Sequence, residues 1–388
     1  MFSRYITIKH DYSFFFFGPR GSGKSTYLRQ TFGSRPQTLW IDLLDPDEEA
    51  LFQVDPNELT RRCQPLPAGT WVVIDEVQKV PRLLNLVHKL IEERSLYFAL
   101  SGSSARKLRR GGANLLAGRA FVNHLYPFTA QELAGHFDLH RAMAWGTLPK
   151  VWSFDEDALK KNFLQAYAHT YLKEEIQAEQ IVRNLPTFRK FIEVAAQMNG
   201  QPINCSKVAR EVRTDHTVVR TYFEILEDTL LGFHVSAYAH SLRRQQRQAQ
   251  KFYFIDCGML RALQKTLDLP VRPKTYEYGR LFEQFVISEC FKHCQYRARD
   301  ETLQYLRTKD GVEVDLIISR PGKATLFIEI KSTDQIMEQD CSSLARITSG
   351  LDDSTALVVS QDPHRKTIGH VQVFPWQEFF TAFLGDRL

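Results

Sequence analysis

The sequence lacks long hydrophobic runs. No apolar stretch among its 388 residues approaches the roughly 20 residues that a helix needs to cross a bilayer. The N-terminal region also lacks the layout of a signal peptide, because its apolar run, Phe14 to Phe17, is too short. We see no internal repeat and no low-complexity tail. These absences predict a soluble, cytoplasmic protein with no membrane partner.

Cysteine is scarce as well, and its spacing excludes a zinc site. The chain has six cysteines, none of them in a zinc-binding pattern. Cys290 and Cys294 are one helical turn apart, which favours buried thiols over a metal site that lacks further ligands. This usage is typical of a protein in a reducing, cytosolic compartment.

The overall composition is that of a globular protein with more than one core. Hydrophobic residues make up 43% of the chain and charged residues 24%. A chain of this length predicts two or three domains. The net charge of +5 permits binding to nucleic acid without requiring it.

Residues 18–25 read GPRGSGKS, a phosphate-binding loop between an apparent strand and an apparent helix. The glycines let the backbone curl so that its N–H groups point at phosphate oxygens, and the helix N-terminus adds its positive dipole end. Lys24 is expected to bridge the β- and γ-phosphates of ATP, and the Ser25 hydroxyl to bind Mg²⁺. The predicted nucleotide-binding residues are Gly18, Pro19, Arg20, Gly21, Ser22, Gly23, Lys24, Ser25 and Thr26.

A second motif lies about 50 residues further on. Val72, Val73 and Ile74 form a short apolar run that predicts a buried parallel strand, and Asp75-Glu76 follows directly. The carboxyl end of such a strand is where an α/β sheet places ligand chemistry. We expect Asp75 to hold the Mg²⁺ shell and Glu76 to orient and deprotonate the attacking water.

A third buried strand is predicted at 96–100, and serines follow it. A polar side chain at this strand end could touch the γ-phosphate or the water, and the candidate is Ser103 or Ser104. The alternative for either serine is a plain turn. Ser103 is the catalytic candidate chosen here.

A basic stretch, Arg106, Lys107, Arg109 and Arg110, precedes GGANLLAGRA. One arginine in this region could act in trans on the ATP of a neighbouring subunit, since a delocalised cation stabilises the charge on a transferring phosphoryl group. Arg119 is the first choice. A solvated basic loop is the alternative interpretation.

Six short motifs occur in order over residues 10–150: GPRGSGKS, VVIDEVQKV, LSGSSARKL, LLAGR, LYPFTAQEL and WGTLPKV. This series resembles the prokaryotic AAA+-like ATPases of the family AAA_14, which are additional-strand, catalytic-glutamate P-loop ATPases. The resemblance implies a parallel sheet between helices. Alternating strand and helix patterns in the sequence agree with that fold.

The middle of the chain predicts a helix-turn-helix. A helical stretch at 156–185 is ended by Pro186, and a second helix follows at 187–198. A short helix at 206–212, a turn and a longer helix at 216–228 come next, and residues 230–238 could form a β-hairpin wing. His216, Thr217 and Arg220 lie on the polar face of the longer helix and are the candidate DNA contacts. The alternative is a winged helix that packs only against protein.

The C-terminal third predicts a helix carrying Glu283, a hairpin turning at Asp310-Gly311, and a further strand. Glu329 and Lys331 are two residues apart and so point to one face of that strand, where Asp315 of the preceding strand can join them. The alternative is an ion-pair network on a sheet.

This carboxylate and lysine pattern resembles the PD-(D/E)XK nuclease superfamily over residues 276–375. The resemblance implies that Asp315 and Glu329 hold Mg²⁺, that Lys331 positions or activates water, and that Glu283 supplies a further acid. Residues 156–375 together resemble the domain of uncharacterised function that usually follows AAA_14 modules. All the residues of the nuclease pattern are present here.

These observations predict an α/β protein with three domains: an AAA+ ATPase domain at 1–150, a helical linker and winged helix-turn-helix at 151–250, and a PD-(D/E)XK nuclease-like domain at 251–388. We expect a Mg²⁺-dependent ATPase that acts on DNA, as an oligomeric motor or remodeller in repair, recombination or defence. A trans-acting Arg119 would imply a homo-oligomeric ring, such as a hexamer. Two alternatives stay open: an ATP-regulated DNA endonuclease, and a nucleotide switch that binds a protein partner.

Overall fold

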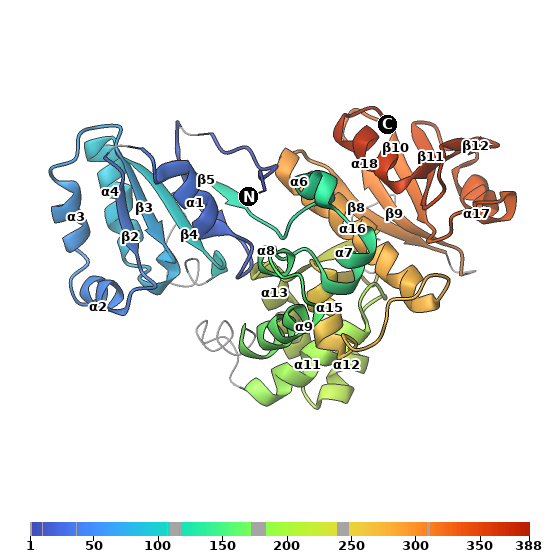
Figure 1. Ribbon diagram of the computed structural model, residues 1–388, viewed down its shortest axis with the longest axis horizontal. Coiled ribbons are helices and arrows are strands. Elements are labelled where there is room, and N and C mark those ends of the chain that lie inside the picture. The colour runs from blue at the N-terminus through green and yellow to red at the C-terminus, as the bar shows by residue number, and fades with distance from the viewer. Residues whose placement is uncertain are drawn as a thin grey trace.

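The computed structural model describes residues 2–9, 11–35, 37–106, 108, 116, 118–171, 184–238, 248–308 and 311–388. Figure 1 shows the N-terminal α/β part, in blue, standing beside a second body that contains the helical middle and the C-terminal sheet. Among the described residues, no helix combines the length and apolar character that crossing a membrane requires.

The N-terminal part contains a five-stranded sheet in the order β2-β3-β4-β1-β5, and all its strand pairs are parallel. Its strands are β1 (Ser13–Phe17), β2 (Leu39–Asp42), β3 (Trp71–Asp75), β4 (Tyr97–Gly102) and β5 (Ala120–His124). β4 lies between β1 and β3, so the strand that precedes the phosphate-binding loop and the strand that ends at Asp75 are not direct neighbours. This mixed α/β fold with a parallel sheet is consistent with a P-loop NTPase core.

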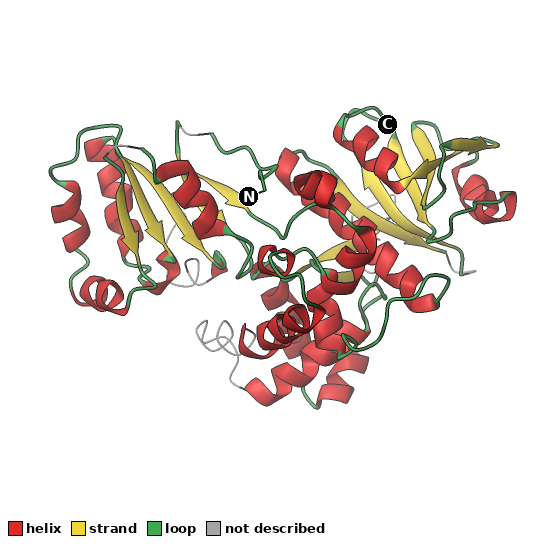
Figure 2. Cartoon of the chain, viewed as in Figure 1, coloured by secondary structure: helices red, strands yellow, loops and turns green. Residues whose placement is uncertain are grey.

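The four consecutive phenylalanines of β1 explain why this sheet is covered on both faces. Phe15 and Phe17 belong to a core that includes α4 residues, while Phe14 and Phe16 belong to a core with Leu28 of α1. Successive side chains of a strand point to opposite faces, so a continuous apolar run is what a strand between two helical layers requires. Figure 2 shows helices on both sides of these strands.

The helices around this sheet are α1 (Lys24–Phe32), α2 (Pro46–Val54), α3 (Glu58–Cys63), the 3₁₀ turn η1 (Val77–Lys79) and α4 (Leu83–Arg94). Asp45 caps α2 by accepting a hydrogen bond from the Asp47 N–H, and Pro46 occupies the first turn of that helix.

The second body begins with a series of helices. They are α6 (Ala130–Leu133), the 3₁₀ turn η2 (Ala134–His136), α7 (Leu139–Trp145), α8 (Pro149–Trp152), α9 (Asp157–Ala166), the π-helical turn η3 (Tyr167–Tyr171), α11 (Leu185–Gln197), α12 (Cys205–Val212), α13 (His216–Asp228) and α15 (Cys257–Gln264). The predicted helix at 156–185 is seen only as α9 and η3, because residues 172–183 lie outside the described residues. Pro186 lies in the first turn of α11 and so begins a helix, as its missing N–H allows.

The C-terminal part is built on an eight-stranded mixed sheet in the order β12-β13-β11-β10-β9-β8-β6-β7. Its strands are β6 (Gly232–Ala237), β7 (Lys251–Phe254), β8 (Thr302–Arg307), β9 (Glu313–Ser319), β10 (Thr325–Ile330), β11 (Ser354–Ser360), β12 (Lys366–Ile368) and β13 (Val371–Pro375). The helices α16 (Tyr276–Arg297), α17 (Glu338–Thr348) and α18 (Trp376–Leu384) complete it. β8 and β9 pair antiparallel as the predicted hairpin, whose turn residue Asp310 lies outside the described residues.

One local prediction was wrong. Residues 230–238 do not form a hairpin by themselves: they contain the single strand β6, which pairs antiparallel with β7 and parallel with β8. Both pairing partners lie outside this segment, so its local pattern did not reveal them. After β7 the chain enters α15, where Asp256 caps the helix through the Met259 N–H.

The middle helices and the C-terminal sheet share one hydrophobic core. A single cluster of buried residues extends from Tyr126 through Phe188 and Phe285 to Phe383. Residues 151–250 and 251–388 are therefore packed together, while the N-terminal sheet has its own two core layers. The proposed boundaries between the three parts remain a prediction.

Candidate nucleotide site and C-terminal pocket

The loop between β1 and α1 has the conformation that its glycines allow. Gly21 and Gly23 have positive φ angles of 76° and 97°, which a side chain would strain. A Cβ at Gly18 would collide with the carbonyl oxygen of Leu125, because the backbone after β5 passes directly beside it. These three positions therefore need glycine for physical reasons, as the loop motif predicted.

Lys24 lies at the start of α1 and is buried. Its Nζ donates to the carbonyl oxygens of Gly18, at 2.7 Å, and of Pro19, at 3.3 Å. The ammonium group is thus folded back over the loop that the sequence assigned to phosphates. Ser25 and Thr26 follow in the first turn of α1, half-buried and exposed respectively.

Asp75 ends β3 and is almost completely buried. Its Oδ1 accepts a hydrogen bond from the Ser101 hydroxyl at the end of β4, while its Oδ2 is buried without a hydrogen-bond partner among the described residues. A buried carboxylate oxygen without a partner is costly unless something else satisfies it. The oxygen chemistry of Asp75 and Ser25 fits the ligands that Mg²⁺ prefers.

Glu76 has a left-handed backbone conformation, with φ of 59°. Non-glycine residues in this region are uncommon, and strain of this kind is found at functional sites. Gln78 holds the Glu76 carboxylate, since its Nε2 donates to Glu76 Oε2 and also to Ser103 Oγ at 3.3 Å. The Glu76 N–H donates to Ser101 Oγ, also at 3.3 Å.

Two residues of this site were missed by the sequence analysis. Ser101 contacts Asp75, whereas the predicted Ser103 is bonded to Gln78 and the alternative Ser104 accepts from the Arg106 N–H. Gln78 connects the glutamate to the end of β4. The sequence could have indicated Gln78 by its position two residues after Glu76, within the turn that orients the glutamate.

Arg119 does not join the nucleotide site of its own chain. It directly precedes β5, whose first residue pairs with the first residue of β1, so it lies at the amino ends of the strands. The phosphate-binding loop follows the carboxyl end of β1. Arg119 forms an ion pair with Glu92 and its side chain is 38% exposed. Lys107, Arg109 and Arg110 of the basic stretch lie outside the described residues.

The middle helices contact the nucleotide part at defined points. Arg106, just after the end of β4, forms an ion pair with Asp228 at the end of α13. Leu230 packs against the core of the N-terminal sheet. Nearer the start of α13, His216, Thr217 and Arg220 are exposed, as their helical spacing predicted. Whether these three residues contact DNA stays a prediction.

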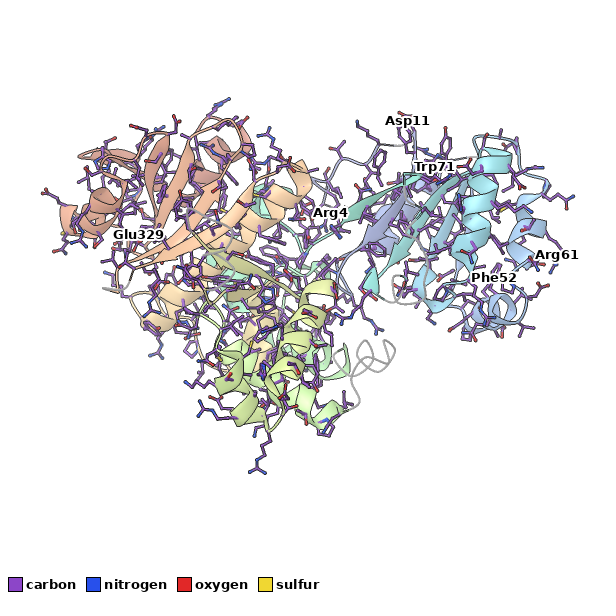
Figure 3. The ribbon with its side chains drawn as sticks, turned by 180° about the vertical axis from the view of Figure 1, so that it is seen from behind. Arg4, Asp11, Phe52, Arg61, Trp71 and Glu329 are labelled. Carbon is purple, nitrogen blue, oxygen red and sulfur yellow. The ribbon has the colours of Figure 1, made fainter. Side chains whose placement is uncertain are left out.

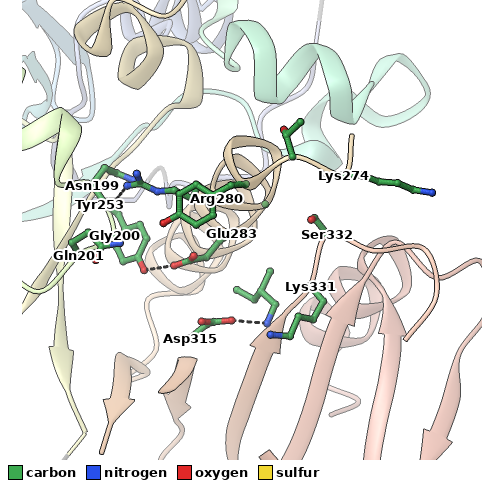
Figure 4. Close-up of a pocket in the computed structure, with 14 residues that line it drawn as sticks. Asn199, Gly200, Gln201, Tyr253, Lys274, Arg280, Glu283, Asp315, Lys331 and Ser332 are labelled. Atoms are coloured by element: carbon green, nitrogen blue, oxygen red, sulfur yellow. Dashed lines mark hydrogen bonds between the residues drawn. The ribbon is translucent and has the colours of Figure 1, made fainter. Parts of the chain in front are cut away.

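In the C-terminal part, the predicted residues Glu283, Asp315 and Lys331 line one cavity of about 520 Å³. Figure 4 shows them together with Tyr253 and Arg280. Glu283 comes from α16, Asp315 from β9, and Lys331 directly follows β10. The fourth predicted residue, Glu329, does not line the cavity but accepts a hydrogen bond from Lys331 Nζ at 2.7 Å.

Each carboxyl group here has a partner within the protein. Glu283 accepts from the Tyr253 hydroxyl at 2.7 Å, and Asp315 accepts from the Ile330 N–H at 2.8 Å. Lys251, a buried residue of β7, lies within 2.5 Å of Glu313. Neither Tyr253 nor Lys251 was predicted, because β7 reaches this site only through its pairing with β6.

Burial shifts the titration of this cluster. Burial and the neighbouring Asp315 raise the pKa of Glu283 to about 7, and the same two causes raise the pKa of Glu329 to about 7. Burial raises the pKa of Asp315 as well. For Lys331, burial acts to lower the pKa, but Glu329 more than offsets it and the pKa is raised. Protonated carboxyls therefore persist here near neutral pH.

The C-terminal cluster does not form a metal site in this arrangement. Within the part of the chain that the structure describes, no group of three or more His, Cys, Asp and Glu side chains is placed to hold a metal ion. The carboxyls of Glu283, Asp315 and Glu329 are bonded to Tyr253, to a backbone N–H and to Lys331 instead. The predicted Mg²⁺ ligation by Asp315 and Glu329 stays a prediction.

Comparison with protein-family models divides the chain into three matches. Residues 11–134 match an AAA domain (AAA_14), residues 136–270 a domain of unknown function (DUF8612), and residues 278–379 a further domain of unknown function (DUF4143). The first match supports an ATPase of the AAA type, with a P-loop that binds nucleotide. No curated protein matches the chain in sequence.

Two solved structures show weak likeness. One is a structure of Drosophila ORC bound to GC-rich DNA and Cdc6, at 11% identity, with 67% of this chain and 86% of the other covered and a TM-score of 0.23. The other is Can2 from Sulfobacillus thermosulfidooxidans in complex with cyclic tetra-adenylate, at 13% identity, with 90% and 98% covered and the same TM-score of 0.23. TM-scores this low carry no argument about fold or function.

Proposed function

We propose that this protein hydrolyses ATP at the carboxyl ends of β1 and β3 and uses the cycle to act on DNA. The observation that carries the proposal is Asp75, buried at the end of β3 with one oxygen satisfied by Ser101 and the other without a partner. Bound Mg²⁺, held by Asp75 and Ser25, would neutralise charge on the β- and γ-phosphates of ATP.

Each residue of the site has a role in this proposal. The loop N–H groups and Lys24 bind the phosphates, so Lys24 must leave its present carbonyl partners when ATP enters. Glu76, oriented by Gln78, accepts a proton as a water oxygen forms a bond to the γ-phosphorus. The bond from that phosphorus to the β,γ-bridging oxygen breaks, which yields ADP and phosphate.

Arg119 supports an oligomeric form of this ATPase. Its position at the amino ends of the strands rules out contact with the ATP of its own chain, so a catalytic role requires a neighbouring copy. A homo-oligomeric ring, such as a hexamer, would supply that neighbouring copy. Arg119→Ala is then expected to lower kcat, and full activity in this variant would remove the residue as a trans-acting candidate.

DNA is the proposed target because α12 and α13, two helices joined by a short turn, agree with the predicted helix-turn-helix and present an exposed polar face. His216, Thr217 and Arg220 lie on that face, and the net charge of the chain is positive. The Arg106–Asp228 ion pair joins this helix to the end of β4, beside the nucleotide site. Through that contact, a change in nucleotide state would alter the DNA contacts of α13. Work on branched or broken DNA in repair, recombination or defence would need such a link.

The test is the ATPase rate with single-stranded, duplex and branched DNA. We expect at least one DNA to bind at modest salt and to stimulate phosphate release, and Glu76→Gln to abolish the stimulated rate. If no DNA binds or changes the rate, the DNA-acting proposal fails. Very slow turnover that DNA does not stimulate would instead favour a nucleotide switch that binds a protein partner.

A second candidate function is DNA cleavage in the C-terminal pocket. It is supported by the convergence of Glu283, Asp315 and Lys331 from separate elements on one cavity. Its carboxyl groups would have to leave their present partners before a metal ion could bind, so we derive no metal-dependent step. This arrangement makes ATP hydrolysis the primary proposal.

A further inference from the structure

The phosphate-binding loop is held from outside by two side chains that do not belong to its motif. An Arg4 guanidinium N–H donates to the carbonyl oxygen of Ser22 at 3.1 Å. The Tyr167 hydroxyl of η3 donates to the carbonyl oxygen of Arg20 at 3.0 Å. One of these residues precedes β1, and the other belongs to the second body of the molecule.

Holding a carbonyl group fixes the N–H group of the next residue. In a planar trans peptide, the C=O and the following N–H point in opposite directions. When Arg4 holds the Ser22 carbonyl, the Gly23 N–H must point away from Arg4. Tyr167 does the same for the Gly21 N–H. Inward-pointing N–H groups are the phosphate-binding element of such a loop, so both contacts preset it for an anion.

Arg4 is itself fixed by a dense set of contacts. Its side chain is only 6% exposed, it forms an ion pair with Glu132 at 3.1 Å, and its guanidinium lies 4.6 Å from the centre of the Phe128 ring. It also donates to the carbonyl oxygen of Tyr126 at 2.5 Å and to the Tyr296 hydroxyl at 3.3 Å. Figure 3 shows Arg4 where the N-terminal sheet meets the second body.

Tyr296 brings the C-terminal part into this contact. Its hydroxyl oxygen also accepts from the Tyr126 N–H at 3.0 Å, and it lies near the end of α16, the helix that carries Glu283. The same helix holds the segment after β5 through Glu289, which accepts from the Ala130 N–H at 2.8 Å, and Lys292, which donates to the Phe128 carbonyl at 3.0 Å. The loop is thus connected to α16 through Arg4.

We propose that Arg4 and Tyr167 are positioning residues for ATP, which hold the loop carbonyls of Ser22 and Arg20, and that Tyr296 of α16 fixes Arg4 in place. This inference rests on the proposed ATPase function and adds the residues outside the motif on which ATP affinity depends. It also links α16 to the nucleotide site through Tyr296, which lies far from the loop in sequence.

The test compares Arg4→Lys with Arg320→Lys. Arg320 is a matched control: it is 6% exposed, directly follows β9 in the C-terminal sheet, and donates to the carbonyl oxygens of Ala324 at 2.6 Å and Leu388 at 3.2 Å. Both variants keep the charge and lose the planar fork of the guanidinium. Thermal melting of each variant reports any general loss of stability.

We expect Arg4→Lys to raise the Kd of a fluorescent ATP analogue and the KM for ATP about tenfold, with kcat changed by less than about threefold. Arg320→Lys should leave both near wild type. Tyr296→Phe and Tyr167→Phe, which remove one hydroxyl each, should raise Kd about threefold. Wild-type Kd in Arg4→Lys, or an equal rise in Arg320→Lys, would overturn the proposal.

Direct binding separates this inference from the proposed function. If wild-type protein binds the analogue but does not hydrolyse ATP, the ATPase proposal fails while the Arg4 comparison is still decided by Kd. If wild-type protein binds no more analogue than Lys24→Ala, both are overturned. A fall in kcat without a change in Kd would also contradict a positioning role for Arg4.

Discussion

The nucleotide site and the C-terminal pocket both contain buried carboxylates, but their hydrogen-bond partners differ. Asp75 keeps one buried oxygen without a hydrogen-bond partner among the described residues. In the pocket, Glu283 and Asp315 are bonded to Tyr253 and to a backbone N–H, and Glu329 is paired with Lys331. The nucleotide site leaves one carboxylate oxygen for a partner that the protein's side chains do not supply, whereas the pocket carboxyls are paired within the protein.

Internal cations account for much of that balance. Lys251 is buried beside Glu313, and its pKa is raised because Glu283 and Glu313 offset the effect of burial. A buried carboxylate cluster without such cations would be strongly destabilising. The same cations already neutralise the carboxylate charge that a divalent metal ion would otherwise neutralise. The comparison therefore predicts catalysis at the first site and mainly a structural or binding role at the second.

The largest expected effect tests the catalytic half of this comparison. Glu76→Gln should lower kcat for ATP about 10³-fold, because the amide cannot accept the proton of the attacking water. Glu283→Gln, the matched change in the pocket, should leave kcat within about twofold of wild type. Phosphate release at saturating ATP measures both. Equal losses in the two variants would remove the distinction between the sites.

Incubation of supercoiled plasmid with protein and Mg²⁺ tests the prediction that the C-terminal pocket is not catalytic. Because the pocket carboxyls are bonded within the protein, we expect nicking no faster than in a sample without protein. A nicking activity that is lost in Lys331→Ala but kept in Lys24→Ala would contradict this prediction. It would show that the pocket rearranges, and it would favour the endonuclease candidate.

The free energy of unfolding should depend on pH because Glu283 is buried in the pocket. Burial raises the pKa of Glu283 from its ordinary value of 4.5 to about 7, so the folded protein binds more protons than the unfolded chain between these values. Stability from this group is present below pH 4.5 and is lost as pH rises through 7. Glu283→Gln should therefore be more stable than wild type at pH 8 by roughly 2 kcal/mol and by much less at pH 5.

Thermal and urea unfolding at the two pH values measure this difference. Glu224→Gln is the control, since Glu224 is exposed on α13 and its substitution should behave like wild type at both values. A stability difference between wild type and Glu283→Gln that does not change with pH would mean that Glu283 ionises freely in the folded protein.

The smallest expected effect concerns DNA. Arg220→Ala should weaken binding about threefold across DNA sequences and lower the salt dependence by about one phosphate contact, because an exposed arginine adds a backbone contact. Arg346→Ala, an exposed arginine on α17, is the control. Titrations of labelled duplex at two salt concentrations measure both variants. Equal weakening by both would indicate non-specific charge instead of a site on α13.

The conformation of the phosphate-binding loop and the burial of the strand before Glu76 follow from the sequence because these elements are local. Gly21, Gly23 and Lys24 act within one turn of chain, and Asp75 directly follows a run of apolar residues that reads as a buried strand. The polar face of α13 was predicted for the same reason, since helical spacing alone decides which residues share it. Ser101 was missed because three serines near the end of β4 are alike in sequence, and only pairing shows which one meets Asp75.

The C-terminal pocket was predicted in part. Asp315, Lys331 and Glu283 do meet, because strand alternation and the hairpin bring them together. Tyr253 and Lys251 could not be predicted, since β7 joins the site by pairing with β6 from a distant part of the chain. These two residues change the chemistry of the cluster, because they supply the partners that the carboxyl groups would otherwise find in a ligand or metal.

The sequence by itself determined the loop, the strand before Asp75-Glu76 and the apolar faces of the helices, because each depends on the spacing of neighbouring residues. Only the tertiary structure decided that Arg4, Tyr167 and Tyr296 hold or support the loop, and that the pocket carboxyls are internally paired. Such contacts join residues that lie far apart along the chain. Their geometry exists only once elements from distant parts of the chain have packed together.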